Sequence, residues 1–540
     1  METHGSLTRR EFLHAAAVGI AATAILPRAL SLAGQTAPPR RPNILMIISD
    51  EHNAGVLGGG GNSLVRTPNL DGLVAQGVLF ENCYCNSPLC VPSRLSFLSG
   101  KYASRVGAWN NSCRLPSAEY PSVPAILNRA GYQAYLCGKM HLDAACRYGF
   151  QEIGKSPTNA HHMGGRGKRR QADDLKASPG YSIRFKDSRP GASSFPMDHD
   201  RRVTGDVTQF LSGRKAGDEP FFLVAGYIAP HFPLTAPEAL WRHYEGKVPM
   251  PQIPEGHLKS QPLNYQHLRV GFHVEDVPEE VIRRSREFYY ALTEWMDGQV
   301  GRVLAALARS GLADNTVIIY SADHGENMGE HGLWWKNCMY EHAAHVPLIV
   351  SSPARWKGGQ RRRGACSLLD VARTITSLGG AESPADWNGD SLVPWLDDPA
   401  TKWKDRAVSE YYAHNIASGY AMIRIGMHKY VYHTPADDKH PAQREIYDLQ
   451  ADPGELDNLA GKAEQRQRLE EMHRALVREI GEEPDRTEQR CRTDIARGYG
   501  PRGAGSEPNP GAASLREPGL GAPWTPALKG MSHDLRSVSA

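Results

Sequence analysis

The apolar positions of the chain follow two repeating patterns, and these predict strands that alternate with helices. Continuous apolar runs predict buried strands: NILMIISD (43–50), PFFLVAGYIAPHFP (220–233), NTVIIYSADHGE (315–326) and HVPLIVSSP (345–353). Helical spacing predicts a helix and then a strand in 67–82 and again in 122–141, and one long helix in 283–311. Such an order predicts an α/β fold, with a large, mostly parallel sheet between two layers of helices.

Near Leu396 the pattern changes to one of antiparallel strands, in residues 420–434 and 444–449. An amphipathic helix is predicted over 463–481. From about Glu483 onward Gly, Pro, Ser and Arg dominate and periodicity is lost, which predicts disorder. The predicted organisation is a catalytic domain (42–395), a smaller α+β subdomain (396–482) and a disordered tail (483–540).

The first 33 residues resemble a twin-arginine export signal. Arg9 and Arg10 precede a short Ala-rich apolar run, and small residues favour cleavage after Ala33. We predict that residues 1–33 are this signal and 34–41 a linker. The run is too short and too weak for a comfortable membrane span, although an uncleaved anchor helix is the alternative. The expected location is the bacterial periplasm or the medium, with the export machinery as a partner and no stable membrane anchor.

Composition narrows the class of protein. The 540 residues are 40% hydrophobic and 22% charged, as in soluble globular enzymes. A formal net charge of +3 argues against a nucleic-acid partner. The basic run in 164–171 is expected to be a solvated loop. Nine cysteines include no C-x-x-C pair, so a thiolate zinc site is not expected, and the odd count leaves at least one unpaired.

Polar residues follow several of the predicted strands, at the edge where open α/β sheets bind ligands. They are Asp50, Lys139 with His141, His231, and Asp323 with His324. Taken singly, an acid at a strand end is more often a cap or a solvated loop residue. Taken together, two carboxylates and an imidazole favour a hard divalent cation such as Ca²⁺ or Mg²⁺.

The stretch CVPSR, residues 90–94, belongs at the same edge. Pro92 suits the first turn of a helix, whose N-terminus presents free N–H groups and positive potential. Arg94 lies one turn after Cys90 and could hold an anion with its planar guanidinium. The local pattern therefore predicts a nucleophile at an anion site beside a metal, although the thiol lacks an obvious base.

The ordered motifs of the chain resemble those of the sulfatases of the alkaline phosphatase superfamily. The resemblance covers about residues 42–460. It is carried by NILMIISDE (43–51), CVPSRLSFLSGKYASRVG (90–107), GYQAYLCGKMHL (131–142), APHFPLTAPEALWRHY (229–244), SADHGENMGEHGLWWKNCMYEHAAHVPLIV (321–350) and EIYDLQADPGELDNLA (445–460). An alkaline phosphatase-like fold is what this resemblance implies.

The resemblance also implies a chemistry. Cys90 would be oxidised by a formylglycine-generating maturation enzyme, and the aldehyde hydrate would attack the sulfur of a sulfate ester and later expel sulfate. Asp50, Asp323, His324 and residue 90 would bind one divalent metal, Ca²⁺ first, with Mg²⁺ or Mn²⁺ as alternatives. Arg94 would stabilise the nucleophile and the anionic ester.

The remaining site residues are carried over in the same way. Lys139 would contact the sulfate and the diol, and His141 would help the sulfated intermediate break down. His231 and Lys336 would contact sulfate oxygens and the leaving group, and either could be the general acid. The substrate would be a sulfated small molecule or glycan.

Two positions depart from the commoner family pattern. Glu51 stands where many members have a second aspartate, so its ligation stays open. His324 stands where many have asparagine, as in the choline-sulfatase and phosphonate monoester hydrolase branch. A phosphonate monoester or phosphodiester hydrolase is therefore the alternative function, and an inactive exported binding protein is a third. Specificity is expected in loops 155–205 and 232–275.

Overall fold

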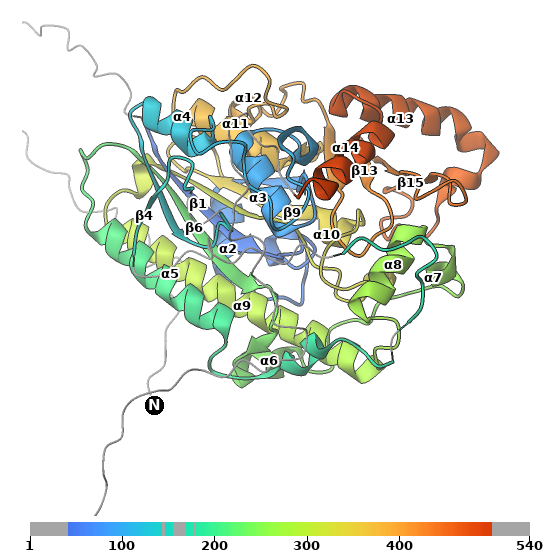
Figure 1. Ribbon diagram of the computed structural model, residues 1–540. Helices are drawn as coiled ribbons and strands as arrows, with labels where there is room; N and C mark the ends of the chain where they lie inside the picture. Colours follow the sequence, from blue (N-terminus) through green and yellow to red (C-terminus); the bar gives the residue numbers. More distant parts are fainter. Residues whose placement is uncertain (1–40, 143–145, 155–167, 178, 499–540) are drawn as a thin grey trace, which may run out of the picture. The chain divides into compact units, whose positions relative to one another are not determined.

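A nine-stranded sheet lies at the centre of the computed structural model, which describes residues 41–142, 146–154, 168–177 and 179–498 (Figure 1). The strand order is β10-β2-β9-β8-β1-β6-β3-β4, and β11 pairs with β2. β9 is antiparallel to β2 and β8, and the other pairs are parallel. The expected α/β fold with a mostly parallel sheet is confirmed. The strands are β1 (Asn43–Asp50), β2 (Val78–Tyr84), β3 (Gln133–Gly138), β4 (Gln151–Glu152), β6 (Phe221–Pro230), β8 (Thr316–Ala322), β9 (His345–Ser351), β10 (Gln360–Arg362) and β11 (Cys366–Ser367).

Alternation along the central strand builds one apolar core on each face of the sheet. In β1, Ile44, Met46 and Ile48 belong to one core, and Leu45 and Ile47 belong to the other. Because successive side chains of a strand point to opposite faces, a continuous apolar run is what a strand buried on both sides requires. The central strands thereby become a rigid platform for the residues that follow them.

Two helical layers cover these cores (Figure 1). Helices α2, α5, α6 and α9 pack on one side, and α3, α4, α11 and α12 pack on the other. The helices of the described chain before the C-terminal sheet are α2 (Pro68–Gln76), α3 (Cys90–Ser99), α4 (Val123–Arg129), α5 (Phe195–Ser212), α6 (Glu238–Tyr244), α7 (His257–Ser260), α8 (Leu263–Phe272), α9 (Glu279–Arg309), α10 (Glu341–Ala344), α11 (Leu368–Leu378) and α12 (Val393–Asp397). Two short paired strands, β5 (Arg189–Pro190) and β7 (Thr235–Ala236), join the two loops that were expected to carry specificity.

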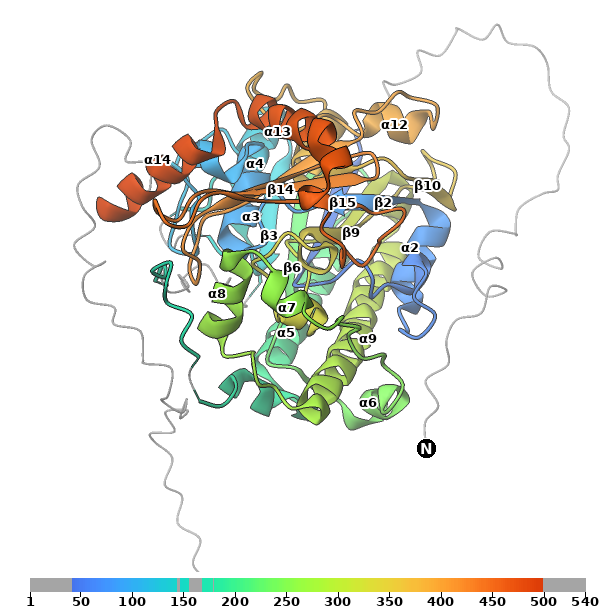
Figure 2. The same ribbon diagram turned by 90° about the vertical axis from the view of Figure 1, so that its right-hand side faces the viewer.

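The C-terminal region forms the predicted antiparallel sheet, in the order β12-β13-β14-β15. Helix α13 (Arg466–Ile480) packs across this sheet (Figure 2). The buried Lys429 of β14 contacts Glu341, the first residue of α10, at 2.8 Å and Glu455 at 2.6 Å. These ion pairs join the C-terminal sheet to α10, and the Lys429 side chain in them is fully buried. The strands are β12 (Arg406–Tyr411), β13 (Tyr420–Ile425), β14 (His428–His433) and β15 (Gln443–Asp448).

The predicted disorder from residue 483 is wrong for the first part of the tail. Residues Pro484–Ala496 form helix α14, which begins with a proline in its first turn and buries Cys491. The Glu488 carboxylate pairs with Arg169 and accepts the amide of Gly419 at 3.0 Å. The composition hid this helix because its stability comes from these tertiary contacts. Residues 499–540 lie outside the described residues.

Two other expectations meet the structure only in part. The proposed export signal and the linker up to residue 40 lie outside the described residues, as does the first half of the basic run 164–171. Arg169 of that run is held by α14 rather than solvated.

All nine cysteines lie in the described part of the chain, and none forms a disulfide. Within the described ranges, no helix has the length and apolar character needed to cross a membrane.

Candidate active site

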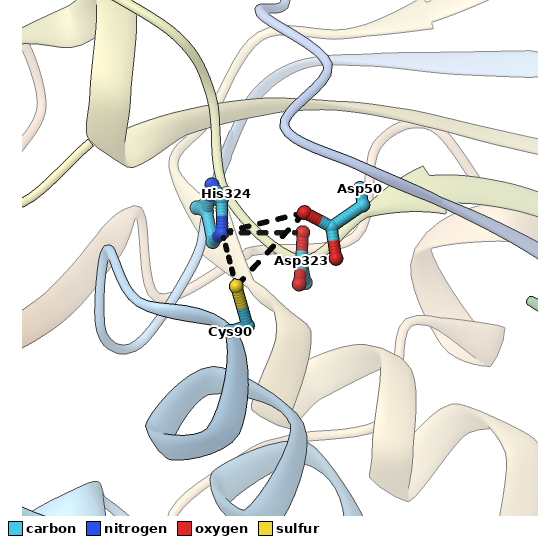
Figure 3. A group of neighbouring side chains, drawn as sticks. All are labelled: Asp50, Cys90, Asp323 and His324. Atoms are coloured by element: carbon cyan, nitrogen blue, oxygen red, sulfur yellow. Dashed lines mark hydrogen bonds and ion pairs between the residues drawn. The ribbon is translucent and has the colours of Figure 1, made fainter. Parts of the chain in front are cut away.

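The polar residues predicted from strand ends come together at one edge of the large sheet. Asp50 ends β1, Asp323 and His324 follow β8, and Cys90 begins α3. All four side chains are buried. They point toward one another from three separate segments (Figure 3). Parallel neighbours β1 and β8 make this possible, because the carboxyl ends of parallel strands lie at the same edge.

These four residues form a compact set of potential metal ligands. One ligand atom from each lies within 4.8 Å of all the others. The Cys90 Sγ is 3.3 Å from His324 Nε2 and 3.9 Å from Asp50 Oδ1 (Figure 3). The other ring nitrogen of His324, Nδ1, is 3.1 Å from the carbonyl of Gly325 and must donate to it, which leaves Nε2 free as a ligand.

Arg94 occupies a position that its sequence neighbourhood did not reveal. Its guanidinium is fully buried and donates to Asp323 Oδ2 and Asp50 Oδ2, each at 2.8 Å. A third bond, of 2.9 Å, reaches the carbonyl oxygen of Lys139. Arg94 thus links β1, β3 and β8 behind the ligand set. Its expected contact with a substrate anion stays a prediction, since the hydrogen bonds described here are all made to the protein.

A second group of charged residues lies on the other side of Asp50. Glu51 has a positive φ of 67°, which turns its carboxylate into the site. Lys336 Nζ lies 3.2 Å from Glu51 Oε1, and His231 Nε2 lies 3.3 Å from Oε2. Neither oxygen accepts a hydrogen bond with good geometry, although both are buried. Asp50, Glu51 and His231 meet the same distance criterion for a metal group.

The segment after β3 supplies the last two predicted residues. Lys139 Nζ contacts Asp50 Oδ2 at 2.6 Å. His141 is buried and has a positive φ of 58°. Gly138 has to be glycine, because its φ is 91° and a Cβ there would lie 2.2 Å from the carbonyl oxygen of Gly226. The close approach of β3 and β6 brings Lys139 toward Asp50.

Positive charge dominates the surroundings of residue 90. Burial and the charge of Asp50 act to raise the pKa of the Cys90 thiol, but Lys336, Lys139 and His324 outweigh them and lower it well below its usual value. Burial likewise acts to raise the pKa of Asp50, yet the cations around it, Lys139 foremost, keep it well below its ordinary range. The site therefore stabilises negative charge at residue 90.

Asp200 of α5 shapes the end of β6, although no sequence motif marks it. Its two carboxylate oxygens accept the amides of Ile228 and Ala229, both at 2.8 Å. These amides immediately precede the segment that carries His231. An acid in the middle of an amphipathic helix gives no signal of this role, which depends on how α5 packs against β6.

The residues present fit a divalent cation. Two carboxylates and an imidazole converge without a hydrogen-bonded protein cation at their centre, and the neighbouring Glu51 carboxylate is buried and lacks hydrogen bonds. Such a donor set is one that Ca²⁺, Mg²⁺ or Mn²⁺ can use.

Comparison with known proteins places this geometry in a family. The family model for sulfatases matches residues 42–381, and the one described as N-sulphoglucosamine sulphohydrolase, C-terminal, matches 329–482. A choline-sulfatase of Rhizobium meliloti (strain 1021) is 32% identical over 440 residues, which cover 78% of this chain and 82% of that protein.

Solved structures agree in fold. One, a complex with its substrate D-glucosamine-2-N,6-O-disulfate, has a TM-score of 0.66 at 25% identity and covers 83% of this chain and 99% of its own. The phosphonate monoester hydrolase of Agrobacterium radiobacter has a TM-score of 0.67 at 24% identity, covering 82% of this chain and 96% of its own. At this identity the second likeness concerns the fold alone.

Proposed function

The chain belongs to the sulfatase family and is a sulfuric ester hydrolase, and we propose that Cys90 becomes its nucleophile after oxidation to formylglycine. One observation carries the proposal. Residue 90 stands at the N-terminus of a buried helix, within ligand distance of Asp50 and His324 and under the positive charge of Lys139 and Lys336. A hydrated aldehyde there would supply one hydroxyl to attack sulfur and a second whose deprotonation lets sulfate leave.

We propose that Asp50, Asp323, His324 and residue 90 hold one divalent cation, Ca²⁺ before Mg²⁺ or Mn²⁺. A bound cation would lower the pKa of the oxygen it holds and offset charge on the ester. Arg94 acts as a positioning residue, because it fixes both carboxylates by 2.8 Å contacts. Whether Glu51 is a further ligand is tested by Glu51→Gln, which should weaken cation binding if it is.

The remaining residues surround the place where the sulfate would lie. Lys139 and Lys336 offer ammonium groups to its oxygens, and His141 is kept for the breakdown step. The Nδ1 of His231 is 2.7 Å from the carbonyl of Phe232 and donates to it. Its Nε2 therefore faces the site and, when protonated, can give a proton to the leaving oxygen. Burial acts to lower the pKa of Lys336, but the charges of Cys90 and Glu51 outweigh it and raise this pKa, so the ammonium gives up a proton less readily and His231 is favoured as the general acid.

The modification is tested by mass spectrometry of the tryptic peptide 67–94, from protein made with a formylglycine-generating enzyme. We expect the mass change of thiol to aldehyde at Cys90 but not at Cys83 or Cys85 in the same peptide. Cys90→Ala should abolish hydrolysis of an aryl sulfate, whereas Cys113→Ala, outside the site, should retain it. An unmodified Cys90 in active enzyme would refute the proposal.

The phosphonate alternative and the inactive binding protein are tested on the same preparation. Turnover of an aryl sulfate should exceed that of the matching aryl phosphonate monoester. A far faster phosphonate reaction would reverse the assignment, and no turnover of either by modified protein would favour the binding protein. Removal of the cation by a chelator should stop turnover, with Ca²⁺ restoring more than Mg²⁺ or Mn²⁺.

We also propose export by the twin-arginine route to the periplasm or the medium, supported by the Arg9–Arg10 pair and the apolar run after it. Export in the folded state would allow Cys90 to be modified first. Replacing Arg9 and Arg10 by lysines should leave the protein in the cytoplasm. Rerouting it through an export path for unfolded chains should yield an unmodified Cys90; equal modification by both routes would contradict this order.

A further inference from the structure

A cationic side chain outside the predicted catalytic set lies beside the active site with no anion in contact with it among the described residues. Arg184 belongs to a short 3₁₀ helix, Ile183–Asp187, in one of the two loops expected to carry specificity. Its guanidinium carbon lies 4.5 Å from the centroid of Phe232 and 4.5 Å from that of Trp335. Phe272, at 5.8 Å, adds a third ring. Within the described residues, the guanidinium makes no hydrogen bond and no ion pair.

The rings that hold Arg184 are physically continuous with the catalytic residues. Phe232 follows His231, and the two rings stack with centroids 4.1 Å apart. Trp335 precedes Lys336, whose ammonium lies 5.4 Å from the centroid of Phe232. The guanidinium and the ammonium are therefore neighbours of one aromatic ring. An anion held by Arg184 would sit next to the sulfate pocket.

The position of Arg184 is fixed by its neighbour in the same short helix. The ring of Phe185 is buried and meets Trp334 edge-on at 4.7 Å and Trp335 at 5.8 Å. Cation–π contacts stabilise the guanidinium from its faces. The N–H donors lie along its edge and donate to no group in the described part of the chain, so the planar fork that matches a carboxylate or a sulfate has no partner there.

A structural role alone accounts poorly for this arrangement. Arginines that only support a fold bond to acids or carbonyls, as Arg94 does here. Arg184 is half-buried, and burial lowers its pKa although the more distant carboxylates of Glu51 and Glu326 act to raise it. A half-buried guanidinium that is held by aromatic rings and has no contacting counter-ion is open to an anionic ligand that supplies one.

A second unpaired polar group comes from the C-terminal subdomain. His414 lies in the loop between β12 and β13 and packs against Phe272 at 5.9 Å. Its Nδ1 is buried and has no hydrogen-bond partner. Burial, together with the positive charges of Arg184 and Lys336, lowers its pKa to about 4, so the ring is neutral at pH 7 and can accept or donate one hydrogen bond.

We propose that Arg184 and His414 form a subsite for a second anionic group of the substrate, next to the sulfate ester that is cleaved. This rests on the proposed function of Cys90 and names its substrate class: sulfate esters that also carry a carboxylate or a second sulfate. A substrate with a cationic group at this place, such as choline O-sulfate, would meet the charge of Arg184 and bind poorly.

The test compares phenyl sulfates that carry a carboxylate, a sulfonate, no group or a trimethylammonium group at the meta or para position. Each is measured with the wild type and with Arg184→Met, and the ratio of the two kcat/KM values cancels differences in leaving-group reactivity. We expect Arg184→Met to lower kcat/KM about ten- to a hundredfold for the anionic compounds, mainly through KM. The unsubstituted compound should change less than about threefold, and the trimethylammonium compound should improve.

Arg189→Met is the matched control, because Arg189 is in the same loop with 62% of its side chain exposed and only a 3.9 Å contact to Asp187. It should leave all ratios unchanged, and the ratios for Arg184→Met should shrink as salt is raised. A larger loss with the carboxylate than with the sulfonate would assign the subsite to acidic sugars, and the reverse would assign it to multiply sulfated ones. Equal losses on anionic and unsubstituted compounds would overturn the proposal.

Failure of the proposed function would look different. If the wild type hydrolysed none of these compounds, the same panel would be titrated calorimetrically against Cys90→Ser and the double variant with Arg184→Met. Tighter binding of the anionic compounds that is lost with Arg184→Met would keep the subsite and reject only the chemistry. Equal binding of all compounds by both variants would reject the subsite.

Discussion

The buried bridge formed by Arg94 should make this residue essential for the stability of the metal-free protein. In Arg94→Met the apolar chain length is kept, but Asp50 and Asp323 lose a partner that now contacts each at 2.8 Å with no exposure on either side. Removing one member of a buried ion pair costs about 3–5 kcal/mol, because the charge left behind is uncompensated. Lys139 still contacts Asp50, so Asp323 should account for most of the loss.

The assay is urea unfolding followed by tryptophan fluorescence, in the presence of a chelator. Arg66→Met is the control, since Arg66 contacts Glu294 at 2.7 Å with 45% of its side chain exposed and should cost no more than about 1 kcal/mol. With saturating Ca²⁺ the deficit of Arg94→Met should shrink, because a divalent cation also neutralises the two carboxylates.

A different outcome would separate the two roles considered for Arg94. If Arg94→Met unfolded in chelator at the same urea concentration as Arg66→Met, the carboxylates would not depend on the guanidinium. Loss of aryl sulfate turnover in such a stable variant would then assign Arg94 to the substrate anion, as the sequence motif suggested.

Three further substitutions test other buried groups. Asp200→Asn should cost about 1–3 kcal/mol and lower kcat, because an amide cannot accept both backbone N–H groups ahead of His231. Lys429→Met should cost about 3–5 kcal/mol in urea unfolding, since it leaves the buried carboxylate of Glu455 without its cation. Burial lowers the pKa of His267 to about 4, so the folded state binds its proton less readily than the unfolded state, and stability should fall as pH drops from about 6.5 to 4. His267→Gln should flatten this dependence.

Each of these has its own control and contrary result. Lys462→Met removes an exposed pair with Asp457 and should change the unfolding free energy by no more than about 1 kcal/mol. An equally small change for Lys429→Met would show that the buried ion pairs of Lys429 do not stabilise the fold. Asp198→Asn, on the same helix as Asp200 but partly exposed, should leave kcat unchanged. An unaltered pH profile in His267→Gln would place the titrating group elsewhere.

The sequence predicted the central sheet well because burial on both faces leaves a direct trace in the chain. Strands β1, β6, β8 and β9 are continuous apolar runs, and the acids and histidines after them can be read without any contact information. Parallel pairing then forces Asp50 and Asp323 to one edge. The motif around Cys90 predicted the chemistry, which the spacing of apolar residues does not indicate.

Tertiary structure alone decided how the charges are shared and what surrounds them. Arg94 lies four residues after Cys90 and was expected to face an anion, yet it donates to the carboxylates of β1 and β8, because the packing of α3 against the sheet points it inward. Helix α14 forms from a segment whose composition predicted disorder, since its buried face is complementary to Arg169 and Gly419. Arg184 meets the rings of Phe232, Phe272 and Trp335, which come from three other segments of the chain. Local sequence determines the strands through the burial of apolar runs and the Cys90 motif through its spacing. The long-range contacts depend on how helices, strands and loops are placed relative to one another, which no local pattern encodes.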